Sequence, residues 1–111
     1  MSKDIVPNYP KDITYNDPSE FNYLTKEEQD ILLDWCDLIL KISTINTKHT
    51  SYGLKHLFSR SRDGFYISNG TFKGAMLKLG FKYAPTDSGI NWMFNISEKS
   101  FKFSQIKVSF L

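Results

Sequence analysis

The alternation of apolar and polar positions predicts a first helix that begins after Thr25. The Thr25 hydroxyl can accept a hydrogen bond from the amide of Glu28, whose carboxylate reaches back to Thr25, the pair known as a capping box. Apolar residues then recur at spacings of three and four, with acidic residues on the opposite face. We expect a helix from Lys26 to Ile42 with an inward stripe of Ile31, Leu32, Trp35, Leu38, Ile39 and Ile42.

A second helix is predicted after residues 43–48, which break the helical period. Either Thr47 or Thr50 can cap this helix, which should run to about Ser61. The turn-forming pair Asp63-Gly64 then stops it. Its expected inward residues are Leu54, Leu57 and Phe58.

The third predicted helix has the clearest signals at both ends. Ser68 can cap its first turn, and Gly80 can supply the left-handed residue that ends it. The expected inward residues between these two signals are Phe72, Ala75, Met76 and Leu79.

The remaining apolar runs predict strands. Phe65-Tyr66-Ile67 is about one short strand long. Residues 81–84 and 90–96 are joined by the turn-rich segment 85–89, which favours a β-hairpin. Within its second strand, Trp92, Phe94 and Ile96 alternate with Asn91, Met93 and Asn95, as a strand with one buried face should.

Together these elements predict an α+β fold, a winged helix-turn-helix with three helices and a β-hairpin wing at residues 25–100. In that fold the third helix enters the major groove of DNA and the wing lies along the backbone. Residues 1–24, with three of the four prolines, are expected to be an extended arm that packs either on the core or on a partner. Residues 101–111 form either a last strand or an apolar tail that binds a partner.

Length and composition agree with one domain of 111 residues, 41% of them hydrophobic and 15% aromatic. The chain has no apolar run of membrane-spanning length and no signal-peptide pattern, so we expect a cytoplasmic protein without a membrane partner. Its one cysteine, Cys36, cannot form an internal disulfide, and no Cys/His cluster has zinc-binding spacing.

The charge is strongly divided along the chain. Residues 1–40 hold three Lys against nine Asp and Glu, a net charge of −6, whereas residues 41–111 hold eleven Lys and Arg against three Asp and Glu, a net charge of +8. This asymmetry favours a polyanionic partner on one side. The alternative is two solvated surfaces without a charged partner.

No residue set in the sequence predicts catalysis. His49 and His56 could share a helix face, but no nucleophile or paired carboxylate accompanies them. There is also no Gly-rich phosphate loop. We therefore expect a protein that is not an enzyme and has no cofactor, metal or small-molecule substrate.

The candidate DNA-binding residues are those that the predicted inward faces leave outside. They come from the second helix and its exit, from the third helix and from the wing: Lys55, Arg60, Arg62, Asn69, Thr71, Lys73, Lys78 and Lys82. Asn can pair with adenine, and Lys and Arg can contact guanine or phosphate. Gly70 and Gly74 would allow a close backbone approach.

Three stretches carry a resemblance to known proteins: Thr50 to His56, Tyr66 to Met76 with Gly80-Phe81, and Asn91 to Ser97. Over residues 50–97 the chain resembles small winged-helix proteins of Gram-positive mobile elements and the winged-helix segments of their replicative helicases and primases. It looks most like the middle proteins of the replication operons of staphylococcal cassette chromosomes. This resemblance implies an accessory subunit that binds DNA, single-stranded or duplex, and partners an A-family polymerase or a helicase of the same element.

Two other functions remain open at this stage. A winged helix can serve as a protein-interaction module, such as an element-encoded inhibitor of a host protein, because fold does not fix function. It can also be a dimeric transcriptional repressor, for which the apolar tail could supply the dimer contact.

Overall fold

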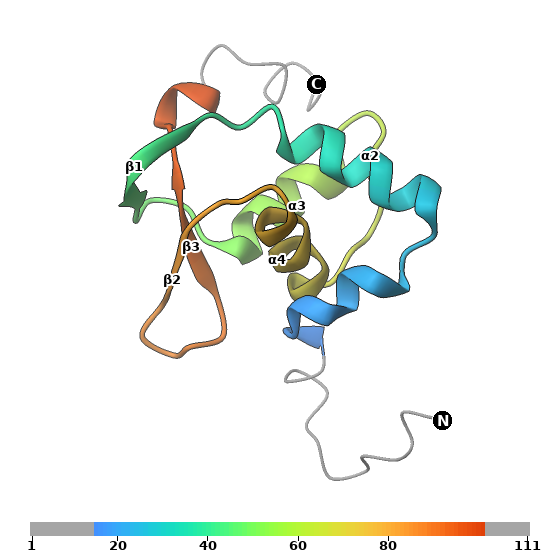
Figure 1. The fold of residues 1–111 in the computed structure, drawn as a ribbon, viewed down its shortest axis with the longest axis horizontal. Helices are drawn as coiled ribbons and strands as arrows, with labels where there is room; N and C mark the ends of the chain where they lie inside the picture. Colours follow the sequence, from blue (N-terminus) through green and yellow to red (C-terminus); the bar gives the residue numbers. More distant parts are fainter. Residues whose placement is uncertain (1–14, 102–111) are drawn as a thin grey trace, which may run out of the picture.

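A computed structural model of the chain describes residues 15–101 and shows an α+β fold (Figure 1). Predictions for residues 1–14 and 102–111 lie outside the described residues. None of the described helices is long and apolar enough to cross a membrane. The elements in chain order are η2 (Pro18–Tyr23), α2 (Lys26–Cys36), β1 (Lys41–Asn46), α3 (Ser51–Arg60), α4 (Asn69–Lys78), β2 (Tyr83–Pro85), β3 (Trp92–Ile96) and η3 (Glu98–Phe101).

The three α-helices begin where their capping residues predict. Thr25 and Glu28 form the capping box, with N–H···O distances of 3.1 and 2.9 Å. Thr50 caps α3 and Ser68 caps α4, each by accepting from the amide three residues later. Gly80 follows α4 with a φ of +82°, in the left-handed region that favours glycine. These local signals are confirmed.

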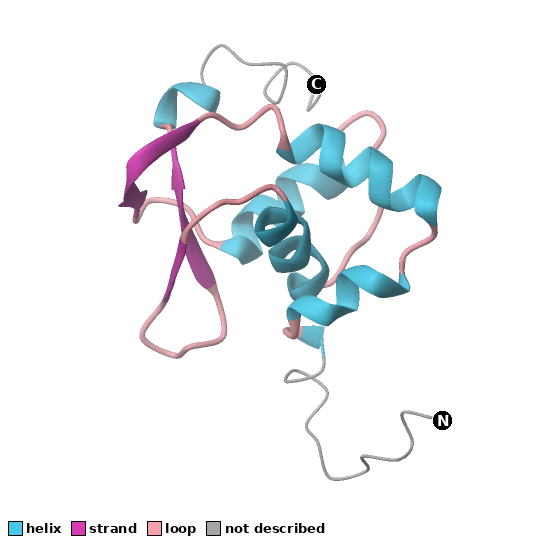
Figure 2. Ribbon diagram, viewed as in Figure 1, coloured by secondary structure: helices cyan, strands magenta, loops and turns pink. Residues whose placement is uncertain are grey.

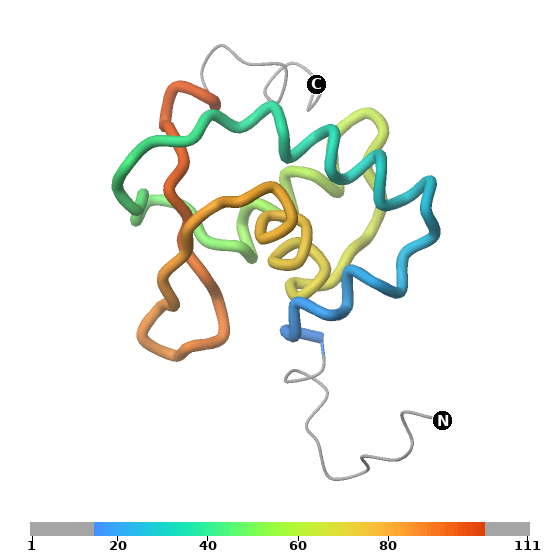
Figure 3. The backbone as a smooth tube through the Cα atoms, viewed as in Figure 1, coloured from blue at the N-terminus to red at the C-terminus, as the bar shows by residue number. Residues whose placement is uncertain are grey.

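The three strands form an antiparallel sheet in the order β1-β3-β2, beside the helices (Figure 2). The predicted hairpin is confirmed, with Tyr83 opposite Phe94 and Pro85 opposite Trp92. Figure 3 shows the loop that connects the two strands. A hydrogen bond from the Thr86 amide to the Asn91 carbonyl closes this loop. The sheet turns Phe94 and Ile96 into the core, where both are fully buried.

The prediction of one helix from Lys26 to Ile42 is wrong beyond Cys36. Residues Lys41–Asn46 instead form β1, which pairs with β3. Ile42 and Leu38, expected on the inward stripe, are 40% and 38% exposed. The β-branched residues of β1 suit a strand, and β3 supplies the backbone hydrogen-bond partners that a helix would otherwise provide within itself.

Two shorter predictions are also wrong. Residues 65–67 have no strand partner among the described residues and run as an irregular segment, although Ile67 is buried. The order of elements is therefore helix, strand, helix, helix, hairpin. Within the predicted arm, Pro18–Tyr23 is a 3₁₀ helix capped by Asp17, not an extended segment.

Helix α4 lies at the centre of the described structure. It contacts η2, α3 and α2, and its contact with η2 is the most extensive of any pair of elements (Figure 1). Phe72, Ala75 and Met76 of α4 are fully buried. Because Phe21 of η2 is also part of the core cluster, the N-terminal segment from residue 15 packs on the core, one of the two outcomes left open by the sequence.

Candidate nucleic-acid interface

The face of α4 expected to contact DNA is covered by the protein itself. Asn69, Thr71 and Lys73 are only 6%, 4% and 3% exposed. The prediction that they point outward is wrong, because an inward stripe deduced from one helix cannot reveal a second packing partner. The partners here are residues 16–21 and the β2–β3 loop.

Lys73 joins these two covering segments. Its ammonium donates to the carbonyl of Asn16 at 3.0 Å and to the carbonyl of Ile90 at 2.6 Å. It also lies 4.7 Å from the centre of the Trp92 ring. Burial lowers the pKa of Lys73, and the nearby carboxylate of Asp17 acts in the opposite direction. Lys73 is thus a packing residue that holds residue 16 against residue 90.

The glycines of α4 serve the same internal contact. A Cβ added at Gly70 would lie 2.7 Å from the backbone nitrogen of Asp17, and one at Gly74 would lie 2.5 Å from the Cβ of Phe21. No side chain fits at either distance. The close approach that Gly70 and Gly74 permit is therefore with the segment that leads into η2, and not with a bound nucleic acid.

The other predicted basic residues lie on several elements. Lys78 and Lys82 are exposed near the end of α4 and before β2, and Arg60 and Arg62 are exposed at the end of α3. Lys55 is only 5% exposed, and its ammonium lies near the rings of Tyr52 and Tyr66. The predicted basic residues are therefore spread over several elements and are not grouped on α4.

A different surface brings aromatic and cationic side chains together. A groove of about 580 Å³ lies between α3 and the first described residues of the chain, Tyr15 and Asn16. Three of its tyrosines are well exposed, Tyr15 by 50%, Tyr52 by 54% and Tyr66 by 77%. We call it the tyrosine groove, and its lining residues are Tyr15, Asn16, Tyr52, Lys55, His56, Tyr66, Ser68, Asn69, Ile90 and Asn91. None of these carries a negative charge.

A lysine ammonium lies between two of the tyrosines. The Lys55 Nζ is 4.9 Å from the ring centre of Tyr66 and 5.5 Å from that of Tyr52, within the range of a cation–π contact. Burial lowers the pKa of Lys55. The next residue, His56, packs edge-on against Tyr52, with 4.5 Å between the two ring centres. Slight burial and then the positive charges of Lys55 and Arg60 lower the pKa of His56.

The floor of the tyrosine groove is a network of amides. The side-chain amide of Asn69 donates to the Oδ1 atoms of Asn16 and Asn91, at 2.6 and 2.9 Å, and to the carbonyl of Ile90 at 3.3 Å. Its own Oδ1 is buried and has no hydrogen-bond partner among the described residues. Asn69 was expected to read a base directly, but it instead fixes the N-terminal segment and the β2–β3 loop, which frame the groove.

Sequence reasoning missed the three tyrosines because they are distant in the chain. Tyr52 is on α3, Tyr66 follows the Asp63-Gly64 turn, and Tyr15 precedes η2. One signal was available for Tyr52, which lies on the helix face opposite the buried Leu54 and Phe58 and so had to be exposed. Nothing local places Tyr66 or Tyr15 beside it.

No protein-family model, curated protein or solved structure matches this chain. Within residues 15–101, no group of three or more His, Cys, Asp or Glu side chains is arranged to hold a metal ion.

Proposed function

We propose that this chain binds single-stranded DNA through the tyrosine groove. The observation that carries the proposal is a groove with three exposed tyrosines, two of which flank a lysine ammonium, and without a carboxylate in its lining. Proteins that bind single strands combine a positive groove with aromatic rings on which bases stack. Tyr52 and Tyr66 would offer the stacking surfaces, and Lys55, with Arg60 one turn beyond His56, would attract phosphate.

The proposed architecture is winged-helix-like. The order helix, strand, helix, helix, hairpin and the sheet order β1-β3-β2 support it, with α3 and α4 as the helical pair and β2–β3 as the wing. One departure is the segment 61–68 between α3 and α4, which is longer than the turn of about 3–4 residues in a helix-turn-helix. With the N-terminal face of α4 covered, major-groove reading of duplex DNA by this helix is disfavoured.

A non-catalytic accessory role, alongside a polymerase or helicase of a mobile element, is the wider form of this proposal. It rests on the resemblance of residues 50–97. Co-purification with the products of neighbouring genes would test it separately from DNA binding.

The direct test is fluorescence anisotropy with a labelled 15-nucleotide single strand. Tyr66→Ala and Tyr52→Ala should each weaken binding about 5- to 150-fold, since base–aromatic stacking contributes about 1–3 kcal/mol per base. Tyr23→Ala is the matched control, because Tyr23 is also a well-exposed tyrosine, at 81%, but lies on η2 outside the groove. Equal losses in all three variants, or wild-type affinity in Tyr66→Ala, would refute the proposal.

Two further arms of the same experiment separate the modes of binding. Affinity for the single strand should fall as salt is raised, because phosphate contacts release counterions. A duplex of the same length should bind more weakly than the single strand. A duplex that binds more tightly, and is insensitive to Tyr52→Ala and Tyr66→Ala, would indicate a surface other than the tyrosine groove.

A further inference from the structure

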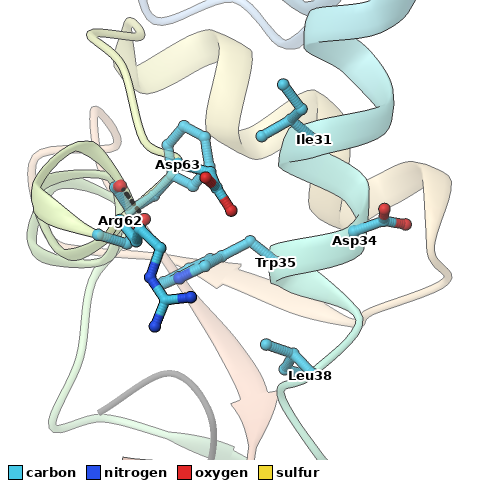
Figure 4. Close-up of a pocket in the computed structure, with 8 residues that line it drawn as sticks. Ile31, Asp34, Trp35, Leu38, Arg62 and Asp63 are labelled. Carbon is cyan, nitrogen blue, oxygen red and sulfur yellow. Dashed lines mark hydrogen bonds between the residues drawn. The ribbon is translucent and has the colours of Figure 1, made fainter. Parts of the chain in front are cut away.

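A second pocket lies between α2 and the C-terminal end of α3, apart from the tyrosine groove. Its volume is about 350 Å³, at the lower end of the range for ligand-binding pockets, about 300–1,000 Å³. Ile31, Leu38, Phe58 and the indole of Trp35 give it an apolar lining. Figure 4 shows the Trp35 ring extending from α2 toward Arg62.

Trp35 carries a polar atom that the described structure leaves without a partner. The residue is 6% exposed, and its indole Nε1 is buried with no hydrogen-bond acceptor among the described residues. Buried donors are almost always paired, so an unpaired indole N–H in a pocket wall indicates an acceptor that is not yet accounted for. A backbone carbonyl of an inserted peptide is such an acceptor.

The rim of the pocket is charged and exposed. Asp34 projects from α2, and Arg62 and Asp63 follow α3 (Figure 4). Neither carboxylate is in an ion pair with any residue between 15 and 101. The rim therefore suits a segment that carries apolar side chains together with at least one lysine.

The chain itself contains a segment of this composition directly after the described residues. Residues 102–111 include two lysines, no acidic residue and five large apolar residues: Phe103, Ile106, Val108, Phe110 and Leu111. The described chain ends next to the residues that follow α2, since the Leu40 amide donates to the Ser100 Oγ at 2.9 Å, and Leu38, two residues before Leu40, lines the pocket. Ten residues reach up to about 33–36 Å when extended, so the pocket is within range.

We propose that residues 102–111 of the same chain bind in this pocket. Apolar side chains of the segment fill the space between Ile31 and Phe58, a backbone carbonyl accepts the Trp35 indole N–H, and a lysine pairs with Asp34 or Asp63. The exposed Leu38 and Leu40 would be covered by the same segment. This inference is independent of the proposed DNA-binding function.

The test follows the indole N–H signals of the full-length, ¹⁵N-labelled protein, in which Trp92→Phe assigns the signal of Trp35. The triple variant Phe103→Ser/Ile106→Ser/Val108→Ser should shift the Trp35 signal and speed its hydrogen exchange at least tenfold. The matched control in the same segment is Ser104→Gly/Gln105→Ser/Ser109→Gly, which should leave the signal unchanged. A free peptide of residues 102–111, added to the apolar triple variant, should restore the wild-type signal saturably.

Two results would overturn the proposal. One is a Trp35 signal that is identical in the wild-type protein and the apolar triple variant. The other is a wild-type dimer that becomes a monomer in the triple variant by sedimentation velocity, because the segment would then occupy the pocket of a second copy.

Discussion

Replacing Gly70 with alanine tests whether the segment before η2 is locked onto α4. In an open helix interior, Gly→Ala stabilises a protein by up to about 1 kcal/mol, because alanine has the higher helix propensity. At Gly70 the added Cβ would lie 2.7 Å from the backbone nitrogen of Asp17. The neighbouring atoms are backbone, so they cannot rotate away as a side chain could.

The magnitude follows from these two opposing effects. Overpacking a close contact costs about 1–3 kcal/mol, which exceeds the gain in helix propensity. We expect Gly70→Ala to lower the free energy of unfolding by about 1–2 kcal/mol. For a domain of this size, that corresponds to a fall in Tm of about 4–16 °C.

Urea denaturation followed by far-UV circular dichroism would measure the effect. Gly53→Ala is the matched control, since Gly53 lies within α3 and a Cβ there would meet nothing closer than the Thr50 Oγ1 at 4.0 Å. It should be neutral or stabilising. A Gly70→Ala protein as stable as the wild type would refute the claim that α4 is covered by residues 17–21.

Two further predictions concern buried and paired charges. Lys73→Met should lower the free energy of unfolding by about 1–3 kcal/mol, because it removes the hydrogen bonds from the ammonium to the carbonyls of Asn16 and Ile90. Lys78→Met, at an exposed site, should change it by less than about 0.5 kcal/mol in chemical denaturation. Glu98→Gln should lower Tm at pH 7, since hydrogen bonds from Asn46 and then His49 lower the pKa of Glu98. This stabilisation is present above the pKa of Glu98 in the unfolded chain, about 4.3, and is lost as pH falls through its lower pKa in the folded protein. The Tm values of wild type and variant should therefore converge below about pH 4. A Tm difference that stays constant across this pH range would contradict the linkage.

The sequence by itself determined the features that depend on neighbours within a few residues. A hydroxyl at Thr25, Thr50 or Ser68 caps the amide three residues later wherever the helix lies in the fold. Gly80 ends α4 because its own φ is positive. The hairpin likewise follows from two apolar runs and the turn between them, and with the helices it gives the α+β class.

Only the tertiary structure decided the features that depend on distant partners. Lys41 and Ile42 continue the apolar spacing of the first predicted helix, but pairing with β3 places them in the strand Lys41–Asn46. The Asn, Thr, Lys and Gly residues on the outer face of α4 predict that this face is exposed to solvent. In the structure, residues 16–21 cover it. The tyrosine groove also arises from packing, since Tyr15, Tyr52 and Tyr66 meet only when η2, α3 and the segment before α4 are assembled. Local spacing predicts which residues can face inward, whereas the second surface that covers a helix is set by contacts far apart in the chain.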